Sequence, residues 1–308
     1  MSRPFVSVII PNYNHKPYLQ QRLDTVFGQT YQDFEVILLD DASTDGSLYI
    51  LELYKDHPKI SHLIVNKENS GRPFKQWKKG IELATGEYIW IAESDDYCKH
   101  NFLESILHQM SEETGVCYAQ TIDVDETGRP LLNRIEYTKE FNPNIWKSDF
   151  ELSGLEFIEK YLLIKNVVPN ASAVIFKRSL VDNTLFTNKL LQMKMCGDWL
   201  FWVKLCEKKN IAFVAEPLNY FRNHSAISRK HNTAKKKKTR LLEEGEIRYY
   251  AFRKLNLNNK SKDEGLLKKW FKLHPFKAIF SKSFYTIRQP LNSKFSLLLK
   301  FLILQLKK

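Results

Sequence analysis

The segment SVIIPNYNHKPYLQQRLDTVFGQTYQDFEVILLDDASTDGS, residues 7–47, joins two apolar runs through a stretch of helical period. Residues 5–10 and 34–39 are rich in Val, Ile and Phe, which is typical of buried strands, and residues 17–27 fit an amphipathic helix. Because the connections are short, the segment predicts a right-handed strand–helix–strand unit with parallel strands. Ligands of such sheets lie beyond the carboxyl ends of the strands, so the polar residues after each apolar run are the first candidates for a site.

The same alternation of apolar runs and helical stretches continues as far as residue 214. Further strands are expected at residues 61–65, 87–92, 116–121, 171–176 and 211–214. Further helices are expected at residues 46–55, 74–84, 101–110, 154–163 and 198–208. This pattern predicts an α/β fold in which helices flank a mostly parallel sheet.

The composition excludes several classes of protein. At 43% hydrophobic and 27% charged residues, a chain of 308 residues can bury a full core, so it is neither disordered nor a disulfide-stapled miniprotein. The four cysteines are far apart and form no zinc-like cluster, which favours buried thiols in a reducing compartment. The N-terminal apolar run is too short for a secretory signal, and no uninterrupted apolar run reaches the length of a membrane span. We therefore expect a cytoplasmic protein.

The net charge of +12 is unevenly distributed along the chain. Residues 1–225 hold 25 Lys and Arg against 30 Asp and Glu, a net of −5, whereas residues 226–308 hold 22 against 5, a net of +17. We therefore expect a mildly acidic globular domain at 1–225 and a basic, mainly helical C-terminal region at 226–308. The partner of such a basic region is expected to be anionic.

Three of the predicted strands end in clusters of polar residues, at 11–14, 40–46 and 93–97. Ser43 and Asp45 precede a helix and are expected to cap it. Side chains alternate along a strand, so one of Asp40 and Asp41 should face the crevice, where a carboxylate can accept hydrogen bonds from a nucleoside. Asp95 and Asp96 repel each other unless a cation lies beside them, which indicates a divalent metal; a solvated helix cap is the alternative.

Two common phosphate-binding loops are absent from the sequence. Neither G-x-G-x-x-G nor G-x-x-x-x-G-K-[ST] follows the first predicted strand. If phosphate is bound, a metal ion and basic side chains must therefore hold it.

Read together, these clusters resemble the family-2 glycosyltransferases, which have the Rossmann-like GT-A fold. The resemblance lies in SVIIPNYN (7–14), QTYQDFEVILLDDASTDGS (29–47), ENSG (68–71) and KGIELATGEYIWIAESDDY (79–97), in this order and spacing. It continues more loosely through MCGDWLFWVKL (195–205) and LNYFRNHSAIS (218–228), so that it spans residues 5–228.

The resemblance implies a set of donor-binding residues. Pro11, Tyr13, Asn14 and Asp41 would hold the nucleoside, and Asp95 would lie near the ribose. The family's arginine ahead of a G-I pair is missing, so the basic contact to the nucleotide would come from one of Arg72, Lys75 and Lys79.

The resemblance also implies the reacting groups. Asp198 at a helix start would be the catalytic base of an inverting transfer, although the acid that precedes it in the family is replaced by Gly197. Asp96 and His224 would bind a divalent metal, Mn²⁺ or Mg²⁺, and Arg222 and His224 would assist the leaving diphosphate. Trp199 would contact the acceptor, and residues 123–150 would form a mobile, partly disordered acceptor loop.

The basic C-terminal region mixes apolar and cationic residues in LLKKWFK (266–272), 276–282 and 295–308. Such stretches are typical of helices that lie on an anionic membrane surface. The alternative is a solvated helical bundle docked on the catalytic domain. Nucleic acid is not an expected partner, because the region has no recognisable nucleic-acid module.

The sequence therefore predicts an inverting, metal-dependent glycosyltransferase, peripheral on the inner face of the cytoplasmic membrane. Its donor would be a nucleotide sugar, most simply a UDP-sugar, and its acceptor a saccharide or lipid-linked saccharide in the synthesis of a surface polysaccharide such as lipopolysaccharide. Two alternatives stay open. One is a nucleotidyltransferase that makes the sugar nucleotide, although PNYNHK is not the glycine-rich, basic loop such an enzyme needs. The other is a non-catalytic membrane-binding scaffold.

Overall fold

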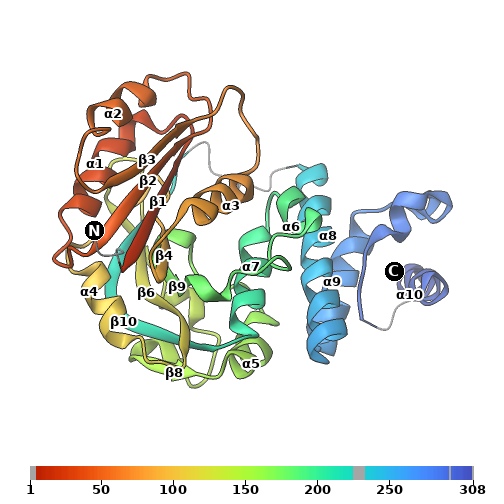
Figure 1. Cartoon of the computed structure of the whole chain (residues 1–308). Helices are drawn as coiled ribbons and strands as arrows, with labels where there is room; N and C mark the ends of the chain where they lie inside the picture. Colours follow the sequence, from red (N-terminus) through yellow and green to blue (C-terminus); the bar gives the residue numbers. More distant parts are fainter. Residues whose placement is uncertain (1–4, 225–232, 291–292, 307–308) are drawn as a thin grey trace.

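The structure, a computed structural model, describes residues 5–224, 233–290 and 293–306 (Figure 1). Residues 5–224, here called the body, form a layered α/β unit around one sheet. Residues 233–306, here called the C-terminal region, form a helical unit that packs on one side of the body (Figure 1). The boundary expected between residues 225 and 232 lies outside the described residues.

The sheet is built from strands that mostly run in one direction. Its order is β3-β2-β1-β4-β9-β6-β10-β5, with β7 added to β6 and β8 added to β10. The pairs β1–β2, β2–β3, β1–β4 and β6–β10 are parallel, and β9 is inserted antiparallel between β4 and β6. The strands are β1 (Val6–Asn12), β2 (Phe34–Asp40), β3 (Ile60–Val65), β4 (Tyr88–Ile91), β5 (Tyr97–Cys98), β6 (Thr114–Val124), β7 (Pro130–Asn133), β8 (Phe150–Leu152), β9 (Val174–Lys177) and β10 (Asn210–Arg222).

Helices cover both faces of the sheet because the residues of each central strand are apolar on both sides. In β1, Val6, Val8 and Ile10 face one cluster of buried side chains, and Ile9 faces the other, as the two-residue period of a strand requires. Helices α1 (Lys16–Phe27), α2 (Ser47–Leu53) and α4 (Phe102–Gln109) cover the first side. Helices α3 (Pro73–Leu83), α5 (Gly154–Phe157), α6 (Asn188–Gln192) and α7 (Gly197–Cys206) cover the second. The predicted α/β class is confirmed.

The insert at residues 123–150, which we expected to be partly disordered, has defined structure. It contains β7 and two 3₁₀ turns, Glu136–Thr138 and Ile145–Lys147. Arg134 forms two hydrogen bonds with the carboxylate of Asp123, at 2.6 and 2.9 Å, and the indole N–H of Trp146 donates to the hydroxyl of Tyr118 at 2.6 Å. These contacts attach the insert to β6.

The C-terminal region is helical, as predicted, and its first helix packs on the body. It comprises α8 (Ala234–Tyr250), which continues as a π turn (Ala251–Leu255), α9 (Lys260–Lys272), two 3₁₀ segments (Phe276–Phe280 and Lys282–Thr286) and α10 (Lys294–Leu306). Ile247 and Ala251 belong to the buried cluster of the body, and Arg248 donates to the carbonyl oxygen of Leu163 at 3.0 Å. The docked arrangement is thus present, with a separate small core formed between α8, α9 and α10.

Within the described ranges, no helix combines the length and the apolar composition required to cross a membrane.

Candidate active site

The turns after β1 and β2 are joined by hydrogen bonds between side chains and backbone. The side-chain amide of Asn12 donates to Asp40 at 2.9 Å, and Asp40 accepts from the backbone N–H of Ser43 at 2.8 Å. Asp45 accepts from the backbone N–H groups of Lys16 and Ser47 at the starts of α1 and α2. Asp40 and Asp45 therefore stabilise the two turns. Asp45 accepts the N–H of the first residue of α2, whose N-cap residue is Gly46, whereas the hydroxyl of Ser43 accepts from Asn12 and Asn14 and caps neither helix.

Asp41 lies just beyond this turn and is buried in its own network. Its carboxylate accepts hydrogen bonds from the side chain of Asn66 (2.6 Å), from the N–H and hydroxyl groups of Ser70 and from Gln76 (2.8 Å). The ammonium of Lys79 donates to Asn66 at 2.7 Å. Asp41 thus orders the loop between β3 and α3 at the strand-end edge of the sheet.

The three basic candidates for the nucleotide contact differ in their surroundings. Lys79 belongs to the Asp41 network, Lys75 is exposed on α3, and the guanidinium of Arg72 donates to the carbonyl oxygen of Gly71. Of the residues of the PNYN turn, Pro11 is buried within β1, whereas the side chain of Tyr13 is 44% exposed. Tyr13 can therefore offer a ring face to a nucleobase, and Lys79 is the basic group connected to Asp41.

The adjacent aspartates Asp95 and Asp96 point into different surroundings. Asp96 is 1% exposed and accepts hydrogen bonds from the side chains of Asn170 (2.5 Å) and Ser172 (2.6 Å) and from the backbone N–H of Arg222 (2.9 Å). Burial, followed by the negative charge of Asp95, raises the pKa of Asp96 to about 7. Both oxygens of Asp96 thus already have protein donors.

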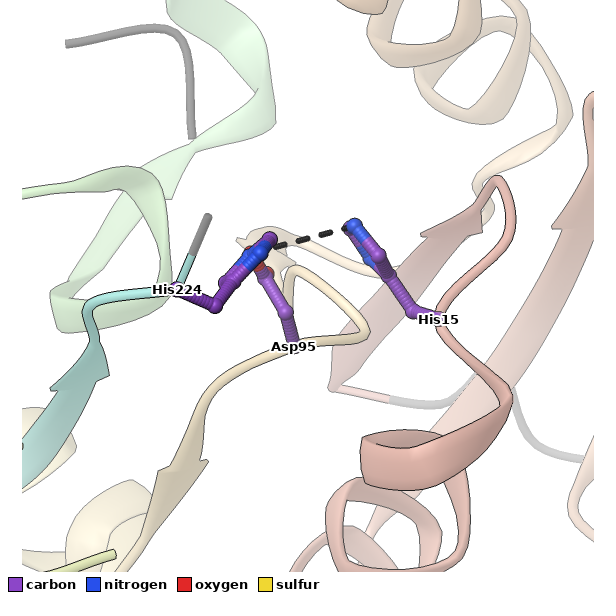
Figure 2. Close-up of side chains that lie close together, drawn as sticks. All are labelled: His15, Asp95 and His224. Atoms are coloured by element: carbon purple, nitrogen blue, oxygen red, sulfur yellow. Dashed lines mark hydrogen bonds and ion pairs between the residues drawn. The ribbon is translucent and has the colours of Figure 1, made fainter. Parts of the chain in front are cut away.

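Asp95 instead faces two histidines that come from distant parts of the chain (Figure 2). Its carboxylate lies 2.9 Å from Nε2 of His224, which follows β10, and 4.0 Å from Nε2 of His15, which precedes α1. One ligand atom from each of the three residues lies within 4.8 Å of the others. Burial by itself would raise the pKa of Asp95, but the hydrogen bond from His224 and the electrostatic interactions with His15 and His224 outweigh it and lower the pKa.

The neighbours of this cluster orient its groups. The hydroxyl of Ser94 lies 2.9 Å from Nδ1 of His15, so the other ring nitrogen is directed at Asp95. Glu93 lies one residue further back and accepts from the indole N–H of Trp77 at 2.8 Å. Burial, then repulsion by Asp95, raises the pKa of Glu93 to about 8. His15 and Glu93 were not among the predicted site residues.

A cavity of about 270 Å³ brings this cluster together with Asp198, the predicted base. The cavity is lined by Pro73, Phe74 and Trp77 of α3, by residues that follow β4 and β10, and by residues of the loop before α7. Its polar lining residues are His15, Glu93, Asp95, Asp96, Asn170, Lys194, Asp198 and His224. The sequence-distant acids at 95, 96 and 198 therefore converge on one cavity.

Asp198 is the second residue of α7, and the start of this helix is closely packed. The side-chain amide of Asn166 donates to Asp198 at 3.1 Å. At Gly197 an added Cβ would lie 2.3 Å from the ring of Phe74, so no larger residue fits. The buried carboxylate of Glu243, from α8, accepts the backbone N–H groups of residues 194, 195 and 196, each at 2.8 Å. Gly197, which takes the place of the acid found before this aspartate in the family, packs against Phe74, and a carboxylate from the C-terminal region lies at this helix start.

A second cavity, of about 330 Å³, adjoins the first at Asp198. Asp198 and Met195 line both cavities. The remaining lining residues of the second cavity are Arg134, Tyr137, Asn166, Val168, Pro169, Cys196, Trp199 and Arg240. Trp199 is 3% exposed and donates to the carbonyl oxygen of Leu162, so it forms a fixed wall. Among the described atoms, Oδ1 of Asn166 is buried and has no hydrogen-bond partner.

We expected Arg222 beside the diphosphate, but its guanidinium instead forms hydrogen bonds with the loops next to the Asp95 cluster. Its guanidinium is 2% exposed and donates to the carbonyl oxygens of Asp95 and Glu126 and to the side chain of Gln21. It also lies over the rings of Tyr18 and Tyr97. Arg222 therefore supports the position of Asp95 and is not among the residues that line the cavity.

Comparison with known proteins adds independent findings. Residues 7–182 match the model of glycosyl transferase family 2. Over 112 residues, which are 36% of this chain, it is 37% identical to the putative teichuronic acid biosynthesis glycosyltransferase TuaG of Bacillus subtilis. Matches to the first curated relatives cover 36% and 44% of those proteins' lengths, so the chain spans less than half of each.

Two solved structures share the fold at low sequence identity. Residues 1–349 of Staphylococcus aureus TarS, in complex with UDP-GlcNAc, superpose with a TM-score of 0.60 at 19% identity, covering 87% of this chain and 80% of the other. The mannosyltransferase PcManGT of Pyrobaculum calidifontis, in complex with GDP-Man and Mn²⁺, gives a TM-score of 0.53 at 17% identity and covers 99% of this chain and 81% of the other. With the family match over more than half of its residues, the chain belongs to glycosyl transferase family 2.

Proposed function

We propose that this glycosyltransferase inverts the anomeric centre as it moves a sugar from a nucleotide-diphosphate donor to a saccharide acceptor. The observation that carries the proposal is that Asp198 and the Asp95–His224 pair line the same cavity. The carboxylate of Asp198 and a cluster of residues able to hold a divalent cation thus share one cavity, which suits an inverting displacement. The carboxylate accepts a proton on one side of the sugar, and negative charge develops on the other.

In the proposed reaction, Asp198 takes the proton from the acceptor hydroxyl as the hydroxyl oxygen attacks the anomeric carbon. The new carbon–oxygen bond forms on the face opposite the bond to the diphosphate, which breaks with its electron pair going to the diphosphate oxygen. Asn166 holds the carboxylate of Asp198 through its amide. Because Asp198 lies at the start of α7, the helix dipole favours its ionised form, which is the form a base needs.

Asp95, His224 and His15 are the residues that would hold a divalent cation. Their donor set fits one, because a carboxylate oxygen and two imidazole nitrogens lie within 4.8 Å of one another. Such a mixed set suits Mn²⁺ better than Mg²⁺, which prefers oxygen ligands. A bound cation supplies positive charge beside the leaving diphosphate. We assign the ligand role to Asp95 in place of Asp96, because both oxygens of Asp96 are engaged by protein donors.

For the donor we propose a UDP-sugar bound over the turns that follow β1 and β2. Tyr13 and Asn14 lie on the first of these turns, and Asp41 and Lys79 lie in the network beside the second. The complex of TarS with UDP-GlcNAc supports a uridine donor, whereas the complex of PcManGT with GDP-Man shows that a guanosine donor occurs on the same fold.

For the acceptor we propose a surface-polysaccharide precursor that enters the second cavity, which Asp198 also lines. The name of the relative TuaG supports such a pathway. Trp199 and Tyr137 provide flat walls for sugar rings, and the unpaired Oδ1 of Asn166 can accept from a sugar hydroxyl. Arg240 and Arg134 also line this cavity, although the guanidinium of Arg134 is already paired with Asp123. The active site would then face the cytoplasm.

Ligand-induced shifts of Tm with UDP, GDP and CDP, with and without Mn²⁺, test the donor site. UDP with Mn²⁺ should raise Tm more than either alone, and release of UDP from a UDP-sugar panel should depend on Mn²⁺. Failure of all nucleoside diphosphates to shift Tm would contradict the donor-site assignment. A nucleotidyltransferase would instead release pyrophosphate from a nucleoside triphosphate and a sugar phosphate, and a scaffold would do neither.

A further inference from the structure

Helix α10 is apolar on two opposite faces, and among the described residues only one of these faces is covered. Leu297 and Phe301 are buried in the core of the C-terminal region, where the ring of Phe301 lies 5.3 Å from that of Phe271. The opposite face carries four exposed apolar side chains, which we call the apolar stripe. They are Phe295 (75% exposed), Leu299 (48%), Ile303 (44%) and Leu306 (87%). Their spacing of three and four residues puts them along one side of the helix.

The neighbouring 3₁₀ segment carries two further exposed apolar side chains, one of them near Phe301. Phe276 is 56% and Phe280 is 86% exposed, and the ring of Phe276 lies 6.4 Å from that of Phe301. The described residues include thirteen exposed large hydrophobic side chains. Six of them, namely Phe276, Phe280 and the four residues of the apolar stripe, lie within residues 276–306. Exposed apolar side chains concentrated in this way mark a surface that is covered by something else.

The segment that carries the apolar stripe is strongly positive, although Glu264 lines a cavity together with Lys300 and Ile303 at its edge. Residues 265–306 contain seven lysines and one arginine and no Asp or Glu. The lysines are all exposed: Lys268, Lys269, Lys272, Lys277, Lys282, Lys294 and Lys300. The nearest acids in the chain are Asp263, which pairs with the buried Arg248, and Glu264. A second copy of the chain docked on this surface would bring lysines against lysines, whereas an anionic surface would neutralise them.

We propose that the apolar stripe, with Phe276 and Phe280, is the face by which this protein docks on an anionic lipid bilayer. The apolar side chains enter the boundary between headgroups and acyl chains, and the surrounding lysines contact the lipid phosphates, which is how amphipathic interfacial helices bind. Figure 1 shows α10 at the far end of the C-terminal region from the sheet, with α8 against the body. The bilayer-facing surface is therefore separate from the cavities around Asp198, and the docking does not depend on the chemistry proposed for them.

Co-sedimentation of the full chain with vesicles tests the proposal. We expect binding to phosphatidylcholine vesicles that contain phosphatidylglycerol, little binding to phosphatidylcholine alone, and loss of binding at high salt. The double variant Phe280→Ser, Phe295→Ser should weaken the partition coefficient at least about tenfold, because two large apolar groups no longer insert. Lys277→Glu with Lys294→Glu should weaken it on anionic vesicles only.

The matched control replaces exposed apolar residues of the body. Tyr49 (68% exposed) and Leu53 (65%) lie on α2, and Tyr49→Ser with Leu53→Ser should leave vesicle binding unchanged. All variants should keep the Tm and the UDP release of the parent chain, which excludes misfolding as the cause. Equal binding to neutral and anionic vesicles, or full binding by the Phe280→Ser, Phe295→Ser variant, would overturn the proposal. So would a parent chain that binds no vesicles and forms a dimer that these substitutions dissociate.

Discussion

At the scale of single residues, the neighbouring carboxylates of Asp95 and Asp96 have different contacts and so different proposed roles. Asp96 is enclosed by Asn170, Ser172 and a backbone N–H, and Asp95 faces His15 and His224. Adjacent side chains in a turn can point in such different directions, and the sequence does not say which one points at the cavity. The resemblance to the family led us to expect the metal at Asp96, and the geometry favours Asp95.

Substituting the two aspartates separately tests this division. Asp95→Asn should abolish Mn²⁺ binding measured by calorimetry. Asp96→Asn should lower the free energy of unfolding by about 2 kcal/mol, because an amide NH₂ placed against the donors of Asn170, Ser172 or residue 222 leaves buried groups unpaired. If Asp96→Asn loses Mn²⁺ binding and keeps its stability, Asp96 and not Asp95 is the metal ligand.

The catalytic role proposed for Asp198 predicts a specific kinetic effect. Asp198→Asn keeps the shape of the side chain but cannot take a proton, so kcat should fall by about 10²- to 10⁴-fold. The Tm shift caused by UDP and Mn²⁺ should remain, since the donor side is untouched. Asp56→Asn, on the exposed surface after α2, is the matched control and should retain full turnover. If Asp198→Asn has a normal kcat, Asp198 is not the catalytic base.

At the scale of elements, the start of α7 is assembled from three parts of the chain. Phe74 of α3 packs against Gly197, Asn166 holds Asp198, and Glu243 of α8 accepts three backbone N–H groups just before the helix. Groups at a helix start that lack partners within the helix are stabilised by such an acceptor, and a negative charge there is favoured by the helix dipole. The C-terminal region therefore helps to position the proposed base.

Removing the charge of Glu243 should affect both stability and turnover. Glu243→Gln leaves one acceptor oxygen for three N–H groups, so the free energy of unfolding should fall by about 2 kcal/mol in urea titrations. We expect kcat to fall, while the Kd for UDP stays constant. Glu264→Gln on α9, whose side chain is exposed, is the control and should change neither quantity. A Glu243→Gln variant with lower stability and normal kcat would make this contact purely structural.

The close contact between Gly197 and Phe74 leads to a second prediction at this scale. Gly197→Ala should destabilise the chain by about 1–3 kcal/mol, because the added Cβ would lie 2.3 Å from the ring of Phe74. Phe74→Leu in the same chain should recover part of the loss by freeing that space. If Gly197→Ala alone is neutral, or if Phe74→Leu adds its own cost without compensation, the contact does not restrict residue 197.

At the scale of the whole molecule, the basic C-terminal region is attached to the body through α8. Ile247 and Ala251 are fully buried in the cluster that also contains residues of α3 and α7, and Tyr250 donates to the carboxylate of Glu207 at 2.8 Å. Beyond α8, a separate core forms around Trp270, Phe284 and Phe301. The region is thus joined to the body by one helix and carries its exposed apolar residues further out.

This arrangement predicts different effects for two truncations. A chain that ends at residue 232 loses α8, uncovers the cluster around α7 and removes Glu243, so it should aggregate or melt well below the full chain. A chain that ends at residue 258 keeps these contacts and should bind UDP with a Tm closer to that of the full chain. Scanning calorimetry and UDP titration measure both. Equal stability of the two truncated chains would show that α8 contributes little to the body.

The sequence by itself determined the elements of the body. The predicted strands at 5–10, 34–39 and 61–65 correspond to β1, β2 and β3 within two residues at each end, because periodicity and apolar composition are local properties of the chain. It did not determine that β9 runs antiparallel between β4 and β6, since strand direction depends on contacts between residues far apart in sequence. The short strands β5, β7 and β8 carry too few residues to show a pattern.

For the site, sequence alone located the acidic strand ends and the helix-opening Asp198, since each is adjacent to a recognisable apolar run. The tertiary structure decided which side chains meet: His15 lies beside Asp95 and His224, and Glu243 reaches a helix start 47 residues earlier in the chain. It also decided that Arg222 faces inward and that one side of α10 stays uncovered. These outcomes depend on the directions of individual side chains and on packing between distant segments, and neither is encoded in the local pattern of residues.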